Sequence, residues 1–375
     1  MELPRRSLLR SGAGALALGT VAGCLSEPGD DETAGEREGY AAFFALWDWA
    51  DEVSGDAMAF TNPVDVGEMG HGWEPPADLQ RNIAGADAFV YLDTPEFSWA
   101  QSMADDLAAD NTDVTVIDAL EGVEGQLLPP GGNHDHDHDH EDEDEHDHED
   151  EEDEHDHEEE DEHDHEDEED EHDHEEEEDE HDHEDDDTAP EFYDPHVWTD
   201  PILAQEMVGT IAAELGEIDP DNAEVYEDNA AAYVERLENV HEQFENLVAD
   251  ADRDVAVFAG HDSFRYLEER YGFELHTPVG VSPNAAETQS DISESIAVVE
   301  EHDIDTILYD PFEAPSEDDL PQMVDLLLEN TGADDYEPIT STEGTTAEWN
   351  DRGWGWVEQM EEVTIPGLRQ ALGAD

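Results

Sequence analysis

Three isolated histidines each lie in a short segment at the start or end of an expected helix or strand. His71, His196 and His261 lie among glycine, proline, aspartate and serine residues. In α/β proteins, ligand sites gather at such ends of elements. Imidazole binds zinc, copper and nickel well, so these side chains predict a transition-metal site if the fold brings them together.

A His-rich acidic tract, residues 134–187, lies between His71 and His196. Residues 134–187 contain only His, Asp and Glu, with 14 histidines and 40 acidic residues. A core Glu-His-Asp-His-Glu recurs every eight or nine residues. This composition cannot bury a core, so we expect a disordered segment. Its paired histidines would chelate zinc weakly and reversibly, and better above about pH 6.5. The alternative is a solvated acidic spacer.

The charge of the chain limits its partners. There are 111 acidic and 11 basic residues, which gives a formal net charge of −100. This charge excludes nucleic acid and anionic membrane surfaces as electrostatic partners and leaves cations. Without the tract, 111 − 40 = 71 acidic residues still face 11 basic ones. Such repulsion is screened in concentrated salt, so we expect a halophilic source, with an acidic mesophilic protein as the alternative.

The N-terminus has the features of an export signal followed by a lipid anchor. A twin arginine at positions 5 and 6 precedes an apolar stretch, 8–22, that is too short to span a bilayer. Val-Ala-Gly then leads into Cys24, the only cysteine. We expect twin-arginine export, removal of residues 1–23, lipidation of Cys24, a flexible tether over 24–39 and no internal disulfide. The protein would then be held by its lipid on the extracellular face of the membrane.

The elements that must position the histidines alternate between strand and helix. We expect strands at 57–64, 88–92, 114–117, 255–259, 275–279 and 306–309, and helices at 75–86, 97–109, 264–271, 292–301, 320–330 and 355–372. A run without proline or glycine, 221–251, predicts one long helix of about 45 Å. This pattern predicts an α/β fold with two lobes, each a parallel sheet flanked by helices, joined by that helix.

The expected domain boundaries follow from this pattern. Residues 40–205 form the N-terminal lobe, with the tract 134–187 inside it, residues 206–251 the connecting segment and long helix, and residues 252–375 the C-terminal lobe.

From about Tyr40 to the C-terminus, apart from the tract, the chain resembles the zinc/manganese family of ABC-transporter substrate-binding proteins. The segment 194–201, Asp-Pro-His-Val-Trp-Thr-Asp-Pro, is close to the family's second-histidine motif. The segments 71–75 and 261–267 are similar to its first and third histidine segments. Asp219-Pro220 introduces a helix like the family's rigid interlobe helix, and a His-rich loop lies at the place of the tract.

The resemblance implies a metal site made by His71, His196, His261 and a glutamate. Glu343, in Ser-Thr-Glu-Gly-Thr, stands where the zinc branch has that glutamate. Asp310, at a strand end, or water is the rival fourth ligand. The manganese members have a carboxylate at the position of His261, so the resemblance favours Zn²⁺ over Mn²⁺. Three imidazoles and one carboxylate also suit tetrahedral zinc.

The resemblance implies that the protein is not an enzyme but a monomeric binding subunit, which captures Zn²⁺ and delivers it to a permease and its ATPase. Two other functions remain open. A passive extracellular zinc buffer or metallochaperone would not need the segment 194–201. A metallohydrolase would need an open metal position for water, and the chain has no His-Glu-x-x-His helix.

Overall fold

The computed structural model describes residues 37–110, 112–129, 193–280, 288–314 and 319–374. The chain divides into one unit made of residues 1–132 and 189–375 and a second made of 133–188. Both sheets lie in the first unit. The expected signal peptide, Cys24 and the tract 134–187 lie outside the described residues.

The N-terminal lobe is built on a parallel sheet with the strand order β2-β1-β3-β4. Its strands are β1 (Arg37–Ala41), β2 (Met58–Thr61), β3 (Ala88–Tyr91) and β4 (Thr115–Asp118). Gly39 of β1 pairs with Phe60 of β2, and any Cβ at Gly39 would come within 2.4 Å of the Phe60 ring. The glycine therefore lets the aromatic ring cover the strand.

The first strand corrects an expected boundary. β1 begins at Arg37, inside the tether expected over 24–39. Its sequence, Arg-Glu-Gly-Tyr-Ala, lacks the apolar run of a central strand, although β1 lies between β2 and β3. Backbone pairing and the ion pair between Arg37 and Asp87 at 3.1 Å hold it instead.

The helices of this lobe are α1 (Phe44–Ser54), α2 (Leu79–Ile83), α3 (Ser98–Ala109) and α4 (Pro201–Ile218). α4 starts sharply because the Asp200 side chain accepts from the backbone N–H of Ile202, and Pro201 occupies the first turn. α4 packs on α1 and on the long helix that comes next in the chain. The expected lobe boundary at 205/206 falls inside this helix, whose buried apolar residues continue across it.

The C-terminal lobe repeats the pattern with the strand order β6-β5-β7-β8. Its elements are β5 (Val255–Phe258), α6 (Arg265–Tyr271), β6 (Glu274–His276), α7 (Gln289–Glu301), β7 (Thr306–Tyr309), α8 (Gln322–Asn330), β8 (Asp335–Pro338), α9 (Ala347–Arg352), α10 (Trp356–Gln359) and α11 (Ile365–Leu372). α10 and α11 are joined by the π-helical turn Met360–Thr364. Pro366 explains this turn, because it has no N–H to continue the α-helical pattern. The expected α/β fold with two parallel sheets is confirmed.

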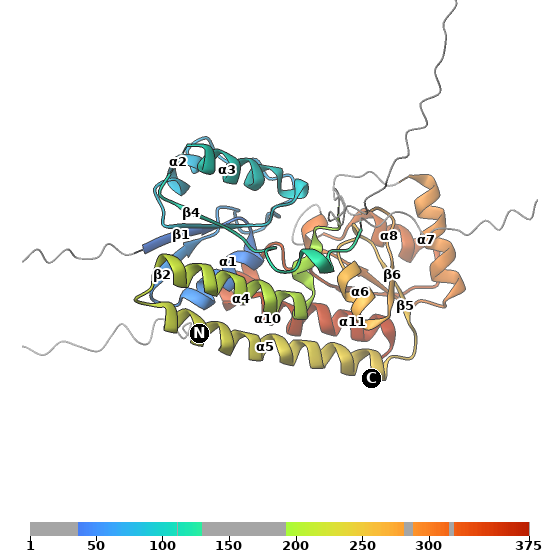
Figure 1. Ribbon diagram of the computed structural model, residues 1–375. Helices are drawn as coiled ribbons and strands as arrows, with labels where there is room; N and C mark the ends of the chain where they lie inside the picture. Colours follow the sequence, from blue (N-terminus) through green and yellow to red (C-terminus); the bar gives the residue numbers. More distant parts are fainter. Residues whose placement is uncertain (1–36, 111, 130–192, 281–287, 315–318, 375) are drawn as a thin grey trace, which may run out of the picture. The chain divides into compact units, whose positions relative to one another are not determined.

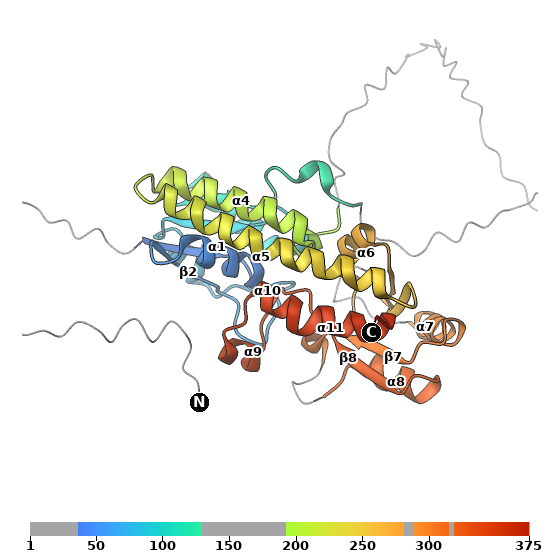
Figure 2. The same cartoon turned by 90° about the horizontal axis from the view of Figure 1, so that it is seen from below.

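The long helix α5 (Ala223–Asp250) passes along both lobes (Figures 1 and 2). Its 28 residues give a length of about 42 Å. It contacts α1 and α4 of the N-terminal lobe and α6, α10 and α11 of the C-terminal lobe. The sequence predicts this helix at 221–251, which is within two residues of its observed ends.

A buried polar contact ties the two lobes to α5. Oδ2 of Asp48 in α1 accepts from the Tyr233 hydroxyl in α5 at 2.8 Å and from the Trp356 N–H at the start of α10 at 2.9 Å. Gly355 is required beside it, because a Cβ there would come within 2.3 Å of the Asp48 carboxylate. One carboxyl group thus joins three helices.

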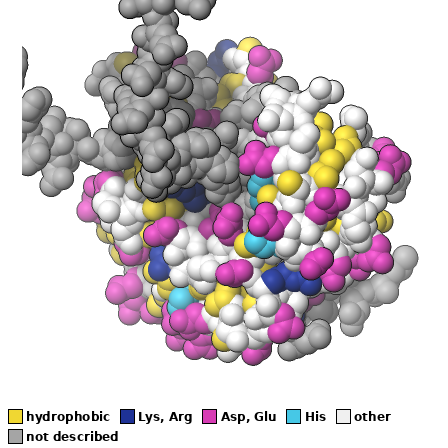
Figure 3. Space-filling model, turned by 90° about the vertical axis from the view of Figure 1, so that its right-hand side faces the viewer, with side chains coloured by type: hydrophobic (Ala, Val, Ile, Leu, Met, Phe, Trp, Pro, Cys, Tyr) yellow, Lys and Arg dark blue, Asp and Glu magenta, His cyan; other side chains and the backbone are white. Residues whose placement is uncertain are grey.

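The surface is strongly acidic where it can be seen. In Figure 3, Asp and Glu side chains are scattered over the whole visible face, and Lys and Arg side chains are few. Among the described helices, none has the length and apolar character needed to cross a membrane.

Candidate metal site

His196 is held in a rigid turn that precedes α4. The 3₁₀ turn η4 (His196–Thr199) begins after Asp194, whose Oδ1 accepts from the backbone N–H of His196 and lies 2.9 Å from its ring Nδ1. The turn is fixed from the other lobe by Tyr266 in α6, whose hydroxyl donates to the Asp194 carbonyl at 2.8 Å. His196 is fully buried, so its position is set before any metal arrives.

His261 follows β5 at the carboxyl end of the second sheet. Its backbone N–H and its ring Nδ1 lie 3.1 and 2.5 Å from Oε1 of Glu313. Glu313 comes from the 3₁₀ turn η5 (Pro311–Glu313), which follows β7. Carboxyl ends of neighbouring parallel strands lie at one edge of a sheet, which is why residues 52 positions apart meet here.

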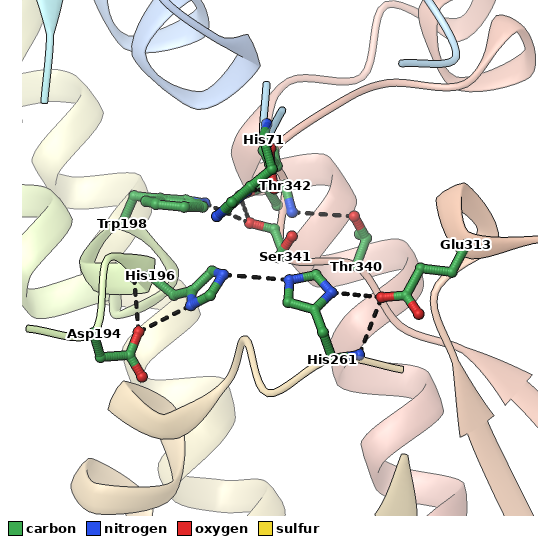
Figure 4. A network of polar contacts seen from close by, with 10 residues as sticks. His71, Asp194, His196, Trp198, His261, Glu313, Thr340, Ser341 and Thr342 are labelled. Atoms are coloured by element: carbon green, nitrogen blue, oxygen red, sulfur yellow. Dashed lines mark hydrogen bonds and ion pairs between the residues drawn. The ribbon is translucent and has the colours of Figure 1, made fainter. Parts of the chain in front are cut away.

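The ring nitrogens opposite these carboxylates face each other. Nε2 of His196 and Nε2 of His261 are 3.3 Å apart (Figure 4). The neighbouring carboxylates favour the tautomer with the proton on Nδ1, in which each Nε2 presents a lone pair. Two nitrogens on one tetrahedral zinc ion, each 2.0–2.1 Å from it, would be about 3.3–3.4 Å apart. The pair therefore has the spacing of two zinc ligands.

His71 and Glu343 come together from different lobes. Oε1 of Glu343 accepts from the His71 backbone N–H at 2.5 Å, and Oε2 lies 2.6 Å from its Nδ1. This second contact is a buried ion pair, whereas Nε2 of His71 is buried without a hydrogen-bond partner. Buried polar atoms left in this way are what a metal ion would satisfy.

The loop that carries Glu343 is strained. Thr342 has a φ of 62°, which is rare for a β-branched residue. Its N–H donates to the Thr340 hydroxyl at 3.0 Å, and the Glu343 carbonyl accepts from the N–H of Phe44 at 3.2 Å. These contacts turn the Glu343 side chain toward His71.

The three imidazole rings form a compact triangle. Their centroids are 5.2 Å (His71 to His196), 5.2 Å (His196 to His261) and 5.8 Å (His71 to His261) apart. Three imidazoles on one tetrahedral zinc ion would have centroids roughly 5 Å apart. As the side chains stand, however, no group of three or more His, Cys, Asp or Glu among the described residues is arranged to hold a metal ion. The ring centroids have the spacing of zinc ligands, but the donor atoms do not converge on one point.

Burial and charge shape the protonation of the site. Burial alone would lower the pKa of His71, but the Glu343 carboxylate outweighs it and the pKa is raised above its usual value. Burial alone would raise the pKa of Glu343, but His71 lowers it. Burial, and then His71 and His261, hold the pKa of His196 well below its usual range. His196 is thus neutral and ready to coordinate.

Asp310, the rival carboxylate, serves the backbone. It is fully buried, and its Oδ1 accepts from the Phe312 N–H at 2.8 Å. Burial, and then the charge of Glu313, raise its pKa well above its usual value. Oδ2 of Asp310 has no hydrogen-bond partner. Asp310 thus uses one oxygen to cap the turn, and its other oxygen keeps it as the rival of Glu343.

The structure thus brings together all four residues named from the sequence, His71, His196, His261 and Glu343. It also adds Glu313, which sequence reasoning missed. Glu313 is one of 111 acidic residues, and only its place directly after a strand could have drawn attention to it. The contact of Asp194 with His196 was likewise not foreseen, although both lie in the segment 194–201.

Comparison with known proteins decides the family. The profile of the family described as zinc-uptake complex component A, periplasmic (ZnuA), matches residues 40–362. The chain belongs to this ZnuA family.

Curated ZnuA-like relatives are distant. The "High-affinity zinc uptake system protein ZnuA" of Bacillus subtilis is 24% identical over 179 residues, which are 48% of this chain and 53% of the relative. The "Zinc-binding lipoprotein AdcA" of Streptococcus pneumoniae is 25% identical over 328 residues, 88% of this chain and 54% of the relative. The chain thus spans about half the length of these curated relatives.

Solved structures share the two-lobe fold. The Zn(II)-bound ZnuA-like domain of Streptococcus pneumoniae AdcA has a TM-score of 0.63 at 23% identity and covers 90% of this chain and 99% of that one. The metal-dependent lipoprotein YcdH of Bacillus subtilis has a TM-score of 0.63 at 20% identity, with the same coverage. At these identities the likeness concerns the fold.

Proposed function

We propose that this protein captures Zn²⁺ outside the cytoplasm and delivers it to an ABC-type permease and its ATPase. One observation carries the proposal: Nε2 of His196 and Nε2 of His261 lie 3.3 Å apart, and the ring centroids of His71 and His261 are both 5.2 Å from that of His196. Membership of the ZnuA family and relatives named for zinc uptake and zinc binding support the same function.

The proposed ligands are His71, His196, His261 and Glu343. Three neutral imidazoles and one carboxylate form a tetrahedral set that suits zinc, whereas manganese prefers more oxygen ligands. Four protein ligands leave no position for an activated water, which speaks against a metallohydrolase.

The proposed location is the extracellular face of the membrane. Twin-arginine export would deliver the protein there, and a lipid on Cys24 would anchor it. We expect it to be a monomer and its partner to be the permease complex. The relative named as a lipoprotein supports the anchor, and the acidic surface is consistent with a salt-rich surrounding.

Zinc retention and uptake test the proposal together. Purified full-length protein, dialysed in high salt against a chelator that strips weakly held metal, should keep one zinc per chain by elemental analysis. Cells that lack the protein should take up less radioactive zinc at scarce supply, and the wild-type gene should restore uptake. Tight zinc binding without any effect on uptake would indicate a passive buffer. Loss of all zinc in dialysis would overturn the proposed site.

A further inference from the structure

Two of the site histidines share one arrangement. A single carboxylate oxygen contacts both the backbone N–H and the ring Nδ1: Oδ1 of Asp194 at His196 and Oε1 of Glu313 at His261. The two carboxylates come from different segments of the chain. A contact repeated on both rings whose Nε2 atoms face each other indicates that it serves the site.

Glu313 makes this contact most directly. Its Oε1 lies 2.5 Å from Nδ1 of His261 and 3.1 Å from the backbone N of the same residue. Two contacts to one residue fix both its backbone and the rotation of its ring. The ring then carries its proton on Nδ1 and exposes the lone pair of Nε2, which is the atom that faces His196.

The surroundings of Glu313 are built for this approach. Gly260 precedes His261, and a Cβ there would lie 3.2 Å from Oε1 of Glu313 and 2.6 Å from the Phe258 ring. Asp310 caps the turn that carries Glu313: its side chain accepts from the Phe312 N–H, and its carbonyl accepts from the Glu313 N–H at 3.1 Å. Both features keep the carboxylate at His261.

We propose that Glu313 is a positioning residue of the metal site, which fixes the tautomer and orientation of His261 so that its Nε2 faces the bound ion. The proposal rests on the proposed zinc function. Glu313 acts through His261 and does not itself bind the metal. In metal sites, partners of this kind raise the basicity of the ligand, and their loss costs about 10–100-fold in affinity.

Two variants of Glu313 and one matched control test it in the full-length protein. Glu313→Ala removes the contacts with the backbone N–H and with Nδ1 of His261. Glu313→Gln removes the charge but keeps an amide oxygen that can accept hydrogen bonds from both groups. Glu268→Gln is the control, because Glu268 also lies in the C-terminal lobe and accepts a backbone N–H, from Leu275 at 2.5 Å. The affinity for zinc is measured by competition with a chelating dye, and the tautomer of His261 by ¹⁵N NMR of histidine-labelled, metal-free protein, with the His261 signal identified by its loss in His261→Gln.

We expect Glu313→Ala to bind zinc about 10–100-fold more weakly and to lose the proton on Nδ1 of His261. Glu313→Gln should keep that proton and bind zinc more tightly than Glu313→Ala, and Glu268→Gln should match the wild type in both measurements. An unchanged tautomer in Glu313→Ala, or a loss of affinity no larger than in Glu268→Gln, would overturn the proposal. If the wild type binds no zinc tightly, the proposed function fails, while the tautomer, which needs no metal, still decides the role of Glu313.

Discussion

Nε2 of His196 and Nε2 of His261 lie 3.3 Å apart, although 65 positions separate the two residues in the sequence. Asp194 contacts Nδ1 of His196, and Glu313 contacts Nδ1 of His261. Each Nδ1 is therefore occupied, and Nε2 is the nitrogen that faces the other ring. In the tautomers that these carboxylates favour, both Nε2 lone pairs point toward each other, an arrangement that a shared proton or a bound metal ion stabilises.

Replacing His196 by alanine should weaken zinc binding by well over tenfold, because the remaining ligands would hold a partly hydrated ion. His302→Ala is the matched control, since His302 is an exposed histidine at the C-terminal end of α7. Competition with a chelating dye measures both. Equal affinities for the two variants would remove His196 from the site.

The fourth ligand can be decided by a pair of amide substitutions. Glu343→Gln should weaken zinc binding about tenfold or more, because it removes the charge that contacts His71. Asp310→Asn should leave the affinity nearly unchanged, because burial already favours the neutral form of Asp310. Zinc titration of both variants gives the order of the two effects. The reverse order would assign the ligand to Asp310.

How far the sequence predicts this site depends on the kind of residue. His71, His196 and His261 are predicted because each lies at the start or end of an expected element within a motif, which His241, His276 and His302 do not. Glu313 was not, because neither charge nor pattern distinguishes it from its acidic neighbours. Its contact with His261 arises only from the order of β5 and β7 in the sheet.

The elements of the fold also differ in how well the sequence predicts them. Apolar strands and the long helix were predicted closely, because burial on regular faces leaves a periodic pattern. β1 and β8 were missed, since Arg-Glu-Gly-Tyr-Ala and Asp-Tyr-Glu-Pro are polar and are held by backbone pairing. The helix α1 was also not foreseen.

Asp48 should make the stability of the protein depend on pH. Burial raises its pKa to about 7 in the folded state, from 3.8. Between these values the folded state holds a proton that the unfolded state has released, so this contribution is complete below about pH 4 and is lost as the pH rises to about 7. Each pKa unit corresponds to about 1.4 kcal/mol, so the loss is at most about 4 kcal/mol.

Asp48→Asn tests this directly. The amide oxygen can still accept from Tyr233 and Trp356, but it does not titrate. Urea unfolding in high salt at pH 5 and pH 8 should show a smaller difference in the free energy of unfolding for the variant than for the wild type. Equal differences would show that Asp48 is already ionised at pH 5.

The contacts of α5 with both lobes predict a small closure on zinc binding. Spin labels at Ala108 in α3 and Glu300 in α7, both exposed, report the distance between lobes. Cys24, the only native thiol, is replaced by serine. Pulsed electron paramagnetic resonance should give nearly the same distance with and without zinc, because a stiff helix resists hinge motion. A large shortening of the distance between the two labels would contradict the view that α5 holds the lobes apart rigidly.

Deleting residues 134–187 should remove several weakly bound zinc ions per chain and leave the one zinc ion that the proposed site binds tightly. Leu128 and Asp194, which flank the segment that contains the tract, are joined by a hydrogen bond from the Asp194 N–H to the Leu128 carbonyl at 2.8 Å, so the deletion need not disturb His196. Calorimetry at pH 6 and pH 8 should detect weak, pH-dependent binding only in the full chain. At scarce zinc the deleted protein should load more slowly. Loss of the tight equivalent would make the tract the principal site.

The hydrogen bond between Asp194 and Leu128 also bears on how this chain can evolve. Repeats inserted between two residues that already touch enlarge a loop without moving its ends. The entropy of closing such a loop rises by only about 0.6 kcal/mol for each doubling of its length. Copies of the eight- or nine-residue repeat can therefore be gained or lost in a lineage at little cost to folding. The number of histidines in the tract is free to follow the supply of metal in the habitat, while the geometry around His196 stays under separate selection.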